Sequence, residues 1–338
     1  MKRIGITIGS ERVPIEKKYY LKHKKAFDEV MSELSDVIED LEGLTYDVQI
    51  YALLKKCAPK NVEIVPLWKT EYTKKDLDEL DLIFCLYEFT YALRDDGEEG
   101  FKKYLRLMKS TKSEVTPSSE FQRFVLSKQT YMNYFKKNGI PIMDTLFYNL
   151  PRYSKDKKDA KILLNKINKK FTGAIYCKPE LGGFAEGSKL FKKLTLTGLK
   201  PYLNQLLKSG YKKLLIQPYI DEFLKFYEIK TIWLNGKFQY AYGQKVKAET
   251  EDVMQSELDQ KLLKELKKKG QEVMKLLSKD FGTPFLLRID WGCCLQNDNV
   301  CREYFLNEIE CCPAMMGTDS EDHDCFERLA KGLIKKLK

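Results

Sequence analysis

The chain reads Arg288-Ile289-Asp290-Trp291 in one apolar stretch and Leu306-Asn307-Glu308-Ile309-Glu310-Cys311-Cys312-Pro313 in the next, with the polar turn 296–299 between them. Both stretches are predicted to be β-strands. Charged groups inside apolar strands are costly unless they are paired or bind a cation. Glu308 and Glu310 are two residues apart and share a face, which Asp290 joins if the strands pair. Three converging carboxylates favour a hard cation such as Mg²⁺, which takes oxygen ligands.

Three weaker patterns precede these strands. Lys178-Pro179 ends a predicted strand ahead of the glycine-containing loop Gly182–Ser188, where the lysine and backbone N–H groups can hold phosphate oxygens. The strand Leu214–Ile220 can offer backbone groups to a purine edge, and the acids just beyond it can accept from ribose hydroxyls. Glu228 and Lys230 share one face of a further strand. Each pattern alone also fits an ordinary turn, a buried strand or a weak ion pair.

The N-terminal part of the chain alternates strand and helix patterns. Strands are predicted at 2–8, 62–67 and 82–86 and a helix over 22–41, which together indicate a small α/β domain with a parallel sheet. The acidic, glycine-containing stretch 94–100 is predicted to be a loop.

Turn and cap residues organise the rest of the chain. Ser118 or Ser119 is expected to cap a helix. Asn235-Gly236 between two apolar runs predicts a tight β-hairpin. Further helices are predicted at 128–138, 161–170, 258–277 and 325–337.

The composition constrains the partners of the chain. Its 338 residues have a net charge of +10, carried mainly by lysine. Because lysines and glutamates are mixed, as in Lys261–Lys275, a solvated surface is favoured over a nucleic-acid partner, and an anionic small substrate is a third explanation. Nine cysteines without a CxxC pair, and two histidines, argue against a zinc site and predict free thiols. No apolar run approaches the ~20 residues that span a bilayer, and residues 1–9 do not resemble a signal peptide, so a cytoplasmic location is expected.

In their order and spacing the four patterns resemble the ATP-grasp superfamily, from about Ser127 to Met316. Ser127–Thr145 resembles the opening "lysine, helix, GIP-x-x-T" of that family, and Lys178–Ser188 resembles its "K-P-x-x-G-G-x-x-x-G" lid. Ile216–Ile220 resembles "x-Q-x-(Y/F)-I", and Glu228-x-Lys230 resembles "E-x-R/K". Asp290 with Glu308–Pro313 resembles the terminal "D … E-x-N-x-x-P", except that Glu310 stands where the family usually has asparagine and adds a negative charge.

The resemblance implies an α/β protein whose catalytic part is α+β. A small Rossmann-like domain would occupy residues 1–120, a lid lobe with the glycine loop 121–213, and a C-terminal lobe with the metal site 214–338, the two lobes clasping ATP. It also implies the residues that bind ATP: Lys128, Lys178, Gly182, Gly183, Gly187, Ser188, Gln217, Pro218, Tyr219, Asp221 and Glu222. Lys178 would lie near the α- and β-phosphates, Gln217 to Tyr219 at adenine, and Asp221 or Glu222 at ribose.

The same resemblance implies the metal and catalytic residues. Asp290, Glu308 and Glu310 would hold two Mg²⁺ ions, for which Mn²⁺ could substitute. Lys230 and Arg288 would face the transferred phosphate or the acyl phosphate. Cys177, beside Lys178, is expected to be a buried strand cysteine and not a nucleophile.

The family most often joins a carboxylate to an amine through an acyl phosphate. The first hypothesis is therefore an ATP- and Mg²⁺-dependent ligase of the glutathione-synthetase or D-alanine-ligase type, acting on a small acidic substrate and an amine. A small-molecule kinase of the inositol-phosphate type, which shares this fold, and a non-catalytic nucleotide-binding protein are the alternatives. Specificity is expected to reside in the N-terminal domain and in Ala314–Asp324.

Overall fold

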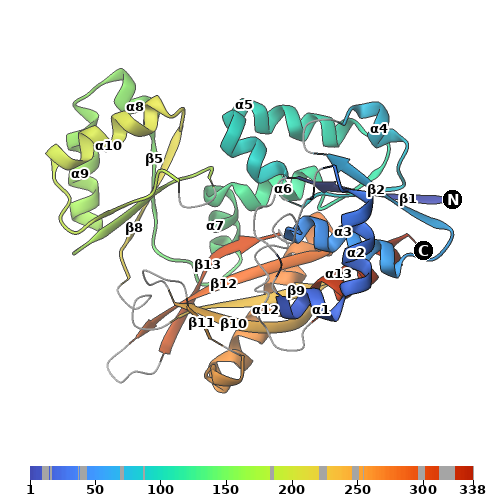
Figure 1. Ribbon diagram of the computed structural model, residues 1–338. Coiled ribbons are helices and arrows are strands. Elements are labelled where there is room, and N and C mark those ends of the chain that lie inside the picture. The colour runs from blue at the N-terminus through green and yellow to red at the C-terminus, as the bar shows by residue number, and fades with distance from the viewer. Residues whose placement is uncertain are drawn as a thin grey trace.

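The computed structural model describes residues 1–9, 15, 17–36, 38, 44–68, 72–86, 88–182, 186–220, 227–245, 251–253, 255–295, 301–311 and 324–337. These residues form three β-sheets with helices around them (Figure 1). Among the described helices, none is both long and apolar enough to cross a membrane.

The N-terminal sheet is parallel, with the strand order β2-β1-β3-β4. Its strands are β1 (Lys2–Ile8), β2 (Val62–Trp68), β3 (Leu82–Phe84) and β4 (Glu114–Thr116), so the predicted parallel sheet is confirmed. The accompanying helices are α1 (Lys17–Lys22), α2 (Lys24–Glu33), α3 (Tyr46–Cys57), α4 (Lys74–Asp78) and α5 (Glu88–Ser110).

Two N-terminal predictions are corrected by the structure. The helix expected over 22–41 is α2, which begins at Lys24 and ends at Glu33, while Lys22 is the last residue of α1. The loop expected at 94–100 is wrong, because the stretch is helical on both sides of a kink at Gly97, whose φ is 65°. Beyond Gly97 the helix buries Phe101 and Met108 in the core, and this apolar burial outweighs the local polar composition.

The middle sheet is antiparallel, with the order β5-β8-β6-β7. Two helices lead into it, α6 (Ser119–Leu126) and α7 (Lys128–Lys137), and the Ser118 hydroxyl caps α6 by accepting from the Phe121 N–H, as predicted. The strands are β5 (Leu146–Asn149), β6 (Ile175–Pro179), β7 (Lys189–Phe191) and β8 (Lys213–Pro218), and the helices are α8 (Leu150–Lys155), α9 (Asp159–Lys170) and α10 (Leu196–Lys208).

Residues 146–220, which we call the middle lobe, enclose a hydrophobic core of their own. The lobe boundary expected at 213/214 does not coincide with a sheet boundary, because β8 lies between β5 and β6. The helices α6 and α7, also expected in the lid lobe, bury Phe124 and Phe135 in the core of the other two sheets. The middle lobe thus spans residues 146–220, whereas the lid lobe was expected at 121–213.

The C-terminal sheet is antiparallel, with the order β11-β10-β9-β12-β13. It contains β9 (Glu228–Leu234), β10 (Lys237–Lys245), β11 (Glu251–Val253), β12 (Leu286–Leu295) and β13 (Cys301–Glu310). The predicted hairpin is confirmed, since Asn235 and Gly236 take φ of 49° and 74° between β9 and β10. A short 3₁₀ turn, η2 (Gln255–Glu257), precedes the long helix α12 (Gln260–Phe281).

The last helix, α13 (Cys325–Lys336), returns to the N-terminal domain and packs against α3. The Lys2 ammonium donates to the Leu337 carbonyl, which brings the two ends of the described chain together (Figure 1). One continuous core joins the N-terminal and C-terminal sheets, for example through Phe84 and Phe285, whose ring centroids are 5.8 Å apart. The molecule therefore consists of a two-sheet body and a separately packed middle lobe.

Candidate active site

A row of charged side chains crosses the C-terminal sheet. Lys230 on β9 lies opposite Asp290 on β12, and Asp290 lies opposite Glu308 on β13, so the three share one face. In the next row Arg288 lies opposite Glu310. The structure therefore brings all three predicted carboxylates together with both predicted catalytic cations.

Asp290 is the most buried of the three site acids, with 1% of its surface exposed. Its Oδ1 accepts from Arg288 Nε at 2.6 Å, and its Oδ2 accepts from Arg288 Nη2 at 2.5 Å and from Lys230 Nζ at 2.7 Å. A carboxylate has about four lone-pair sites, so one site on Oδ1 is left after these bonds. Asp290 is therefore held in one orientation and retains room for one further ligand bond.

Lys230 extends this network to the next acid. Its Nζ donates to Glu228 Oε2 at 2.6 Å, while Glu228 Oε1 accepts from Asn307 Nδ2 at 2.6 Å. Asn307 is the residue that the β12–β13 register skips after Asp290, and this bulge turns its amide toward Glu228. A lysine ammonium has three donors, so one N–H of Lys230 remains after its bonds to Asp290 and Glu228.

The surroundings shift the pKa values of Glu308 and Glu310 in opposite directions. Burial alone would raise the pKa of Glu308, but the charges of Lys128 and Lys178 lower it to about 2. Burial raises the pKa of Glu310 to about 7, and repulsion from Glu308 adds to that rise. Within the described chain, the Glu310 carboxylate has neither a hydrogen bond nor an ion pair. A half-buried carboxylate without a partner, next to a second carboxylate, is an environment that a bound cation stabilises.

Two lysines approach these acids from outside the C-terminal sheet. Lys128, at the start of α7, is 6% exposed; its Nζ donates to the Gly182 carbonyl at 2.6 Å and lies 3.3 Å from Glu308 Oε1. Lys178 lies on β6 of the middle lobe, and burial lowers its pKa. The nearby charge of Glu308 opposes this shift, whereas the charge of Lys128 adds to it. Cationic groups from two different parts of the chain therefore converge on Glu308.

The predicted adenine residues lie at the end of β8. The Gln217 side chain donates to Thr145 Oγ1 at 2.9 Å, which fixes it within the protein. The Tyr219 N–H donates to the Ala174 carbonyl at 2.9 Å, so this backbone donor is used, and Pro218 has none. The predicted ribose acids Asp221 and Glu222 lie outside the described residues.

The glycine loop is described only at its two ends, and Gly183 lies outside the described residues. Gly182 receives the Lys128 bond, and the Gly187 carbonyl accepts from Tyr202 Oη at 2.7 Å. Gly187 has φ 69°, and a Cβ there would lie 2.8 Å from the Pro179 side chain, so only glycine fits. Ser188 lies between this turn and β7. Cys177 is fully buried, and burial raises the pKa of its thiol to about 12, which leaves it inert, as predicted.

Two site residues were not found by sequence reasoning. Glu180, 4% exposed, accepts from the Ser127 hydroxyl and from the Gln129 N–H, and so holds the start of α7 that carries Lys128. The acid directly after Lys178-Pro179 was the available sequence signal. Tyr131 has a buried hydroxyl without a hydrogen-bond partner among the described residues, and Glu308 and Glu310 lie near enough to help raise its pKa. Nothing in the helical pattern around Tyr131 separates it from an ordinary core residue.

Comparison with known proteins identifies the fold. No protein-family model matches the chain, and no curated protein matches it by sequence. Among solved structures, D-cycloserine synthetase DcsG has a TM-score of 0.67 at 14% identity, covering 99% of this chain and 100% of that one. D-alanine–D-alanine ligase from Bacillus anthracis complexed with ATP has a TM-score of 0.58 at 17% identity, covering 98% and 95%. The ATP-grasp ligase PsnB, complexed with a phosphomimetic variant of its minimal precursor, Mg and ADP, has a TM-score of 0.57 at 11% identity, covering 87% and 95%. The predicted α/β architecture is thereby confirmed, and the chain has the ATP-grasp fold over nearly its whole length.

Proposed function

We propose that this chain is an ATP- and Mg²⁺-dependent carboxylate–amine ligase that activates an acidic substrate as an acyl phosphate. One observation carries the proposal: Glu308 lies at the meeting point of Lys128, Lys178 and the Lys230–Asp290–Arg288 cluster. Such a site offers anionic oxygens for a cation and ammonium groups for phosphates side by side. The likeness to ligases solved with ATP and with Mg and ADP supports it.

The acids fit Mg²⁺ by their chemistry. Asp290, Glu308 and Glu310 supply only oxygen atoms, and Glu310 has no partner of its own among the described residues. We assign these three residues to two Mg²⁺ ions, which Mn²⁺ can replace and which neutralise phosphate charge when bound. The carboxylate of Glu310 binds Mg²⁺ as an asparagine would, and adds one negative charge.

The two steps of the reaction suggest roles for the remaining residues of the site. In the first step a substrate carboxylate oxygen bonds to the γ-phosphorus of ATP and ADP leaves; in the second an amine nitrogen attacks the acyl carbon and inorganic phosphate leaves. Neither step needs a protein nucleophile. Lys178 and Lys128 would hold the phosphates, with Gly182, Gly187 and Ser188 at the ends of the loop over them. Lys230 has one N–H left for a phosphate oxygen, and Arg288 orients Asp290.

The nucleotide base would lie at the end of β8. We assign Gln217, Pro218 and Tyr219 to the wall of the adenine pocket. Since the Tyr219 N–H is already bonded to Ala174, any hydrogen bond to the base has to come from another group of this segment.

The test is ADP release from the full chain with Mg²⁺, measured against panels of carboxylic acids, amino acids and peptides, each with and without an amine. Glu308→Gln should lower turnover by about 100-fold or more, because it removes the central charge of the site. The matched control is Glu272→Gln on α12, a half-exposed acid paired with Lys269. Unchanged turnover in Glu308→Gln with a normal circular dichroism spectrum would remove the site assignment.

A small-molecule kinase is the second candidate, favoured by the many lysines of the middle lobe. A ligase needs both an acid and an amine for full ADP release, whereas a kinase needs a single polyol, such as an inositol phosphate. Nucleotide binding without ADP release under any of these conditions would indicate a non-catalytic binding protein.

A further inference from the structure

The charge of the chain is concentrated in the middle lobe. Residues 146–220 contain 16 lysines and arginines and 4 aspartates and glutamates, a net charge of +12. The whole chain has 59 basic and 49 acidic residues, a net charge of +10, so the rest of the chain sums to −2. The asymmetry comes mainly from the scarcity of acids in the lobe, and a uniformly lysine-rich composition does not explain it.

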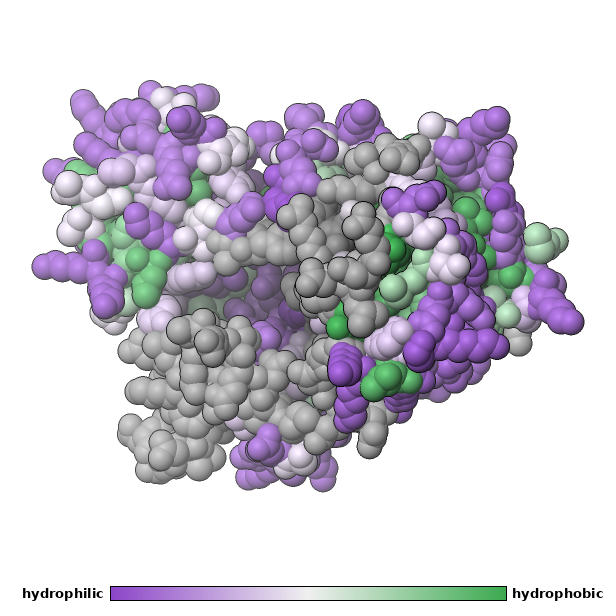
Figure 2. All heavy atoms as spheres, in the orientation of Figure 1, coloured by the Kyte–Doolittle hydropathy of each residue, from purple (hydrophilic) through white to green (hydrophobic). Residues whose placement is uncertain are grey.

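Few of these cations are neutralised inside the protein. Within the described chain, only Arg152, Lys170 and Lys212 of the middle lobe have a carboxylate oxygen within 4.0 Å. Lys178 faces the active site, and the other lysines lie on the exterior of the lobe, where Figure 2 shows a hydrophilic surface at the upper left. Such a surface attracts polyanions over roughly a Debye length, about 8 Å at physiological ionic strength.

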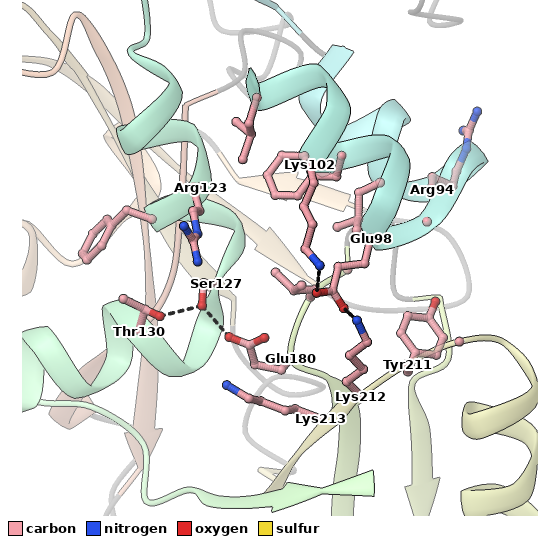
Figure 3. A pocket seen from close by; sticks show the side chains of 18 of the residues that line it. Arg94, Glu98, Lys102, Arg123, Ser127, Thr130, Glu180, Tyr211, Lys212 and Lys213 are labelled. Atoms are coloured by element: carbon pink, nitrogen blue, oxygen red, sulfur yellow. Dashed lines mark hydrogen bonds and ion pairs between the residues drawn. The ribbon is translucent and has the colours of Figure 1, made fainter. Parts of the chain in front are cut away.

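A pocket of about 960 Å³ lies where the middle lobe faces α5 and α6 (Figure 3). Arg123 on α6 and Lys213 on β8 point into it from opposite walls, and neither forms an ion pair with the described residues. Glu98 on α5 bridges the two walls by pairing with Lys212 at 2.7 Å and with Lys102 at 3.0 Å. Apolar side chains also line the pocket: Leu93, Phe101, Leu105, Phe124, Leu181 and Phe281.

The pocket shares a wall with the candidate active site. Ser127 and Gly182 line the pocket, while Lys128 follows Ser127 and donates to the Gly182 carbonyl. Glu180 lines it too and holds Ser127 through a hydrogen bond. A ligand in this pocket lies directly behind the lysine that contacts Glu308.

We propose that the pocket and the adjoining basic surface of the middle lobe dock an acidic polypeptide, which carries the carboxylate that the ligase activates. This substrate class rests on the proposed function. The docked segment and the reacting carboxylate occupy different places, so the pocket raises the local concentration of substrate and takes no part in the chemistry.

The lining of the pocket favours a polypeptide over a nucleic acid. Glu98, Glu120, Glu180 and Glu186 alternate with the cations around it. A nucleic acid has one negative charge at every nucleotide and would meet these glutamates with like charge. A polypeptide can place its acids against Arg123 and Lys213 and its apolar side chains against the half-buried Leu105 and Phe281.

The test uses the full chain and a fluorescein-labelled peptide of about 20 residues that alternates Glu-Asp pairs with leucine, followed by fluorescence anisotropy. Arg123→Glu with Lys213→Glu should weaken binding by at least about tenfold, since two attractive contacts become repulsive. Both residues are exposed and form no ion pair within the described chain, so the reversal does not disturb folding. The control is Lys264→Glu with Lys268→Glu on α12, the same change of charge on the body, which should leave binding within about twofold.

The remaining outcomes separate the two proposals. Three results would overturn the acidic-polypeptide assignment. They are equal binding of a neutral peptide, undiminished peptide binding by the Arg123/Lys213 variant, and tighter binding of an RNA or DNA duplex of similar length. Binding of a fluorescent ATP analogue with Mg²⁺ is measured on the same samples. Intact nucleotide binding without peptide binding overturns only this inference, whereas peptide binding without nucleotide binding overturns the proposed function and the substrate role with it. If the peptide is turned over, the double variant should raise its KM and leave kcat unchanged.

Discussion

Lys128 and Lys178 have the same proposed role at the phosphates, yet their replacement by methionine should affect the free protein in opposite ways. The Lys128 ammonium donates to the Gly182 carbonyl at 2.6 Å and pairs with Glu308 at 3.3 Å. A hydrogen bond from a charged group contributes about 1.5–3 kcal/mol, so Lys128→Met should lower the free energy of unfolding by about that amount.

Lys178 has no hydrogen bond or ion pair among the described residues, and its pKa lies below the ordinary 10.5, with burial as the largest cause. Its positive charge is therefore a net cost to the folded state even with Glu308 nearby. Lys178→Met should leave the free energy of unfolding unchanged or raise it. Both variants should weaken ATP binding by about 10- to 150-fold, the equivalent of one charged hydrogen bond.

The assay is urea unfolding without nucleotide, followed by tryptophan fluorescence, together with titration calorimetry of ATP and Mg²⁺. Trp233 and Trp291 are buried in the C-terminal sheet and report on the site directly. A loss of stability in Lys178→Met as large as in Lys128→Met would refute the reasoning, because it would show that the free protein already uses the Lys178 charge. Normal ATP affinity in both variants would remove the lysines from the nucleotide site.

Two further predictions concern stability. Burial lowers the pKa of His23 below its ordinary 6.5; the charge of Asp324 opposes this shift and the charge of Lys56 adds to it. Below pH 6.5 the folded state therefore binds fewer protons than the unfolded state. The free energy of unfolding should therefore fall as the pH drops below about 6.5, and His23→Gln should flatten this slope in urea titrations; an unchanged slope would contradict the assignment. Gly270→Ala would place a Cβ 2.2 Å from the Trp233 ring and should cost about 1–3 kcal/mol in the same assay. Gly198→Ala, whose nearest neighbour lies at 3.5 Å, is the control and should be neutral or stabilising; equal losses would show that the Trp233 contact is not the cause.

Local rules account for a large part of the fold. The hairpin at Asn235-Gly236 follows from the positive φ that its two-residue turn requires. The common face of Glu308 and Glu310 follows from the two-residue period of a strand, and pairing of β12 with β13 adds Asp290 to it. These features depend on neighbours in sequence or on the simplest strand pairing, so the pattern of residues was enough to predict them.

Other features depend on contacts between distant segments. The stretch around Gly97 has the composition of a loop, but its helix is stabilised by the apolar side chains that α5 buries in the body. The position of β8 between β5 and β6 depends on which strand ends meet, and no local pattern encodes that choice.

The residue types of the candidate site were thus readable from the chain, whereas their protonation and pairing were not. Whether Asp290 would be bonded by Arg288 and Lys230, and whether Lys128 or Lys178 would reach Glu308, depends on how three sheets pack together. The net charge of the middle lobe can be counted from its sequence, but the pocket beside it forms only where the lobe meets α5 and α6. Electrostatic interactions act through space and depend on burial, and both the distances and the burial come from non-local packing.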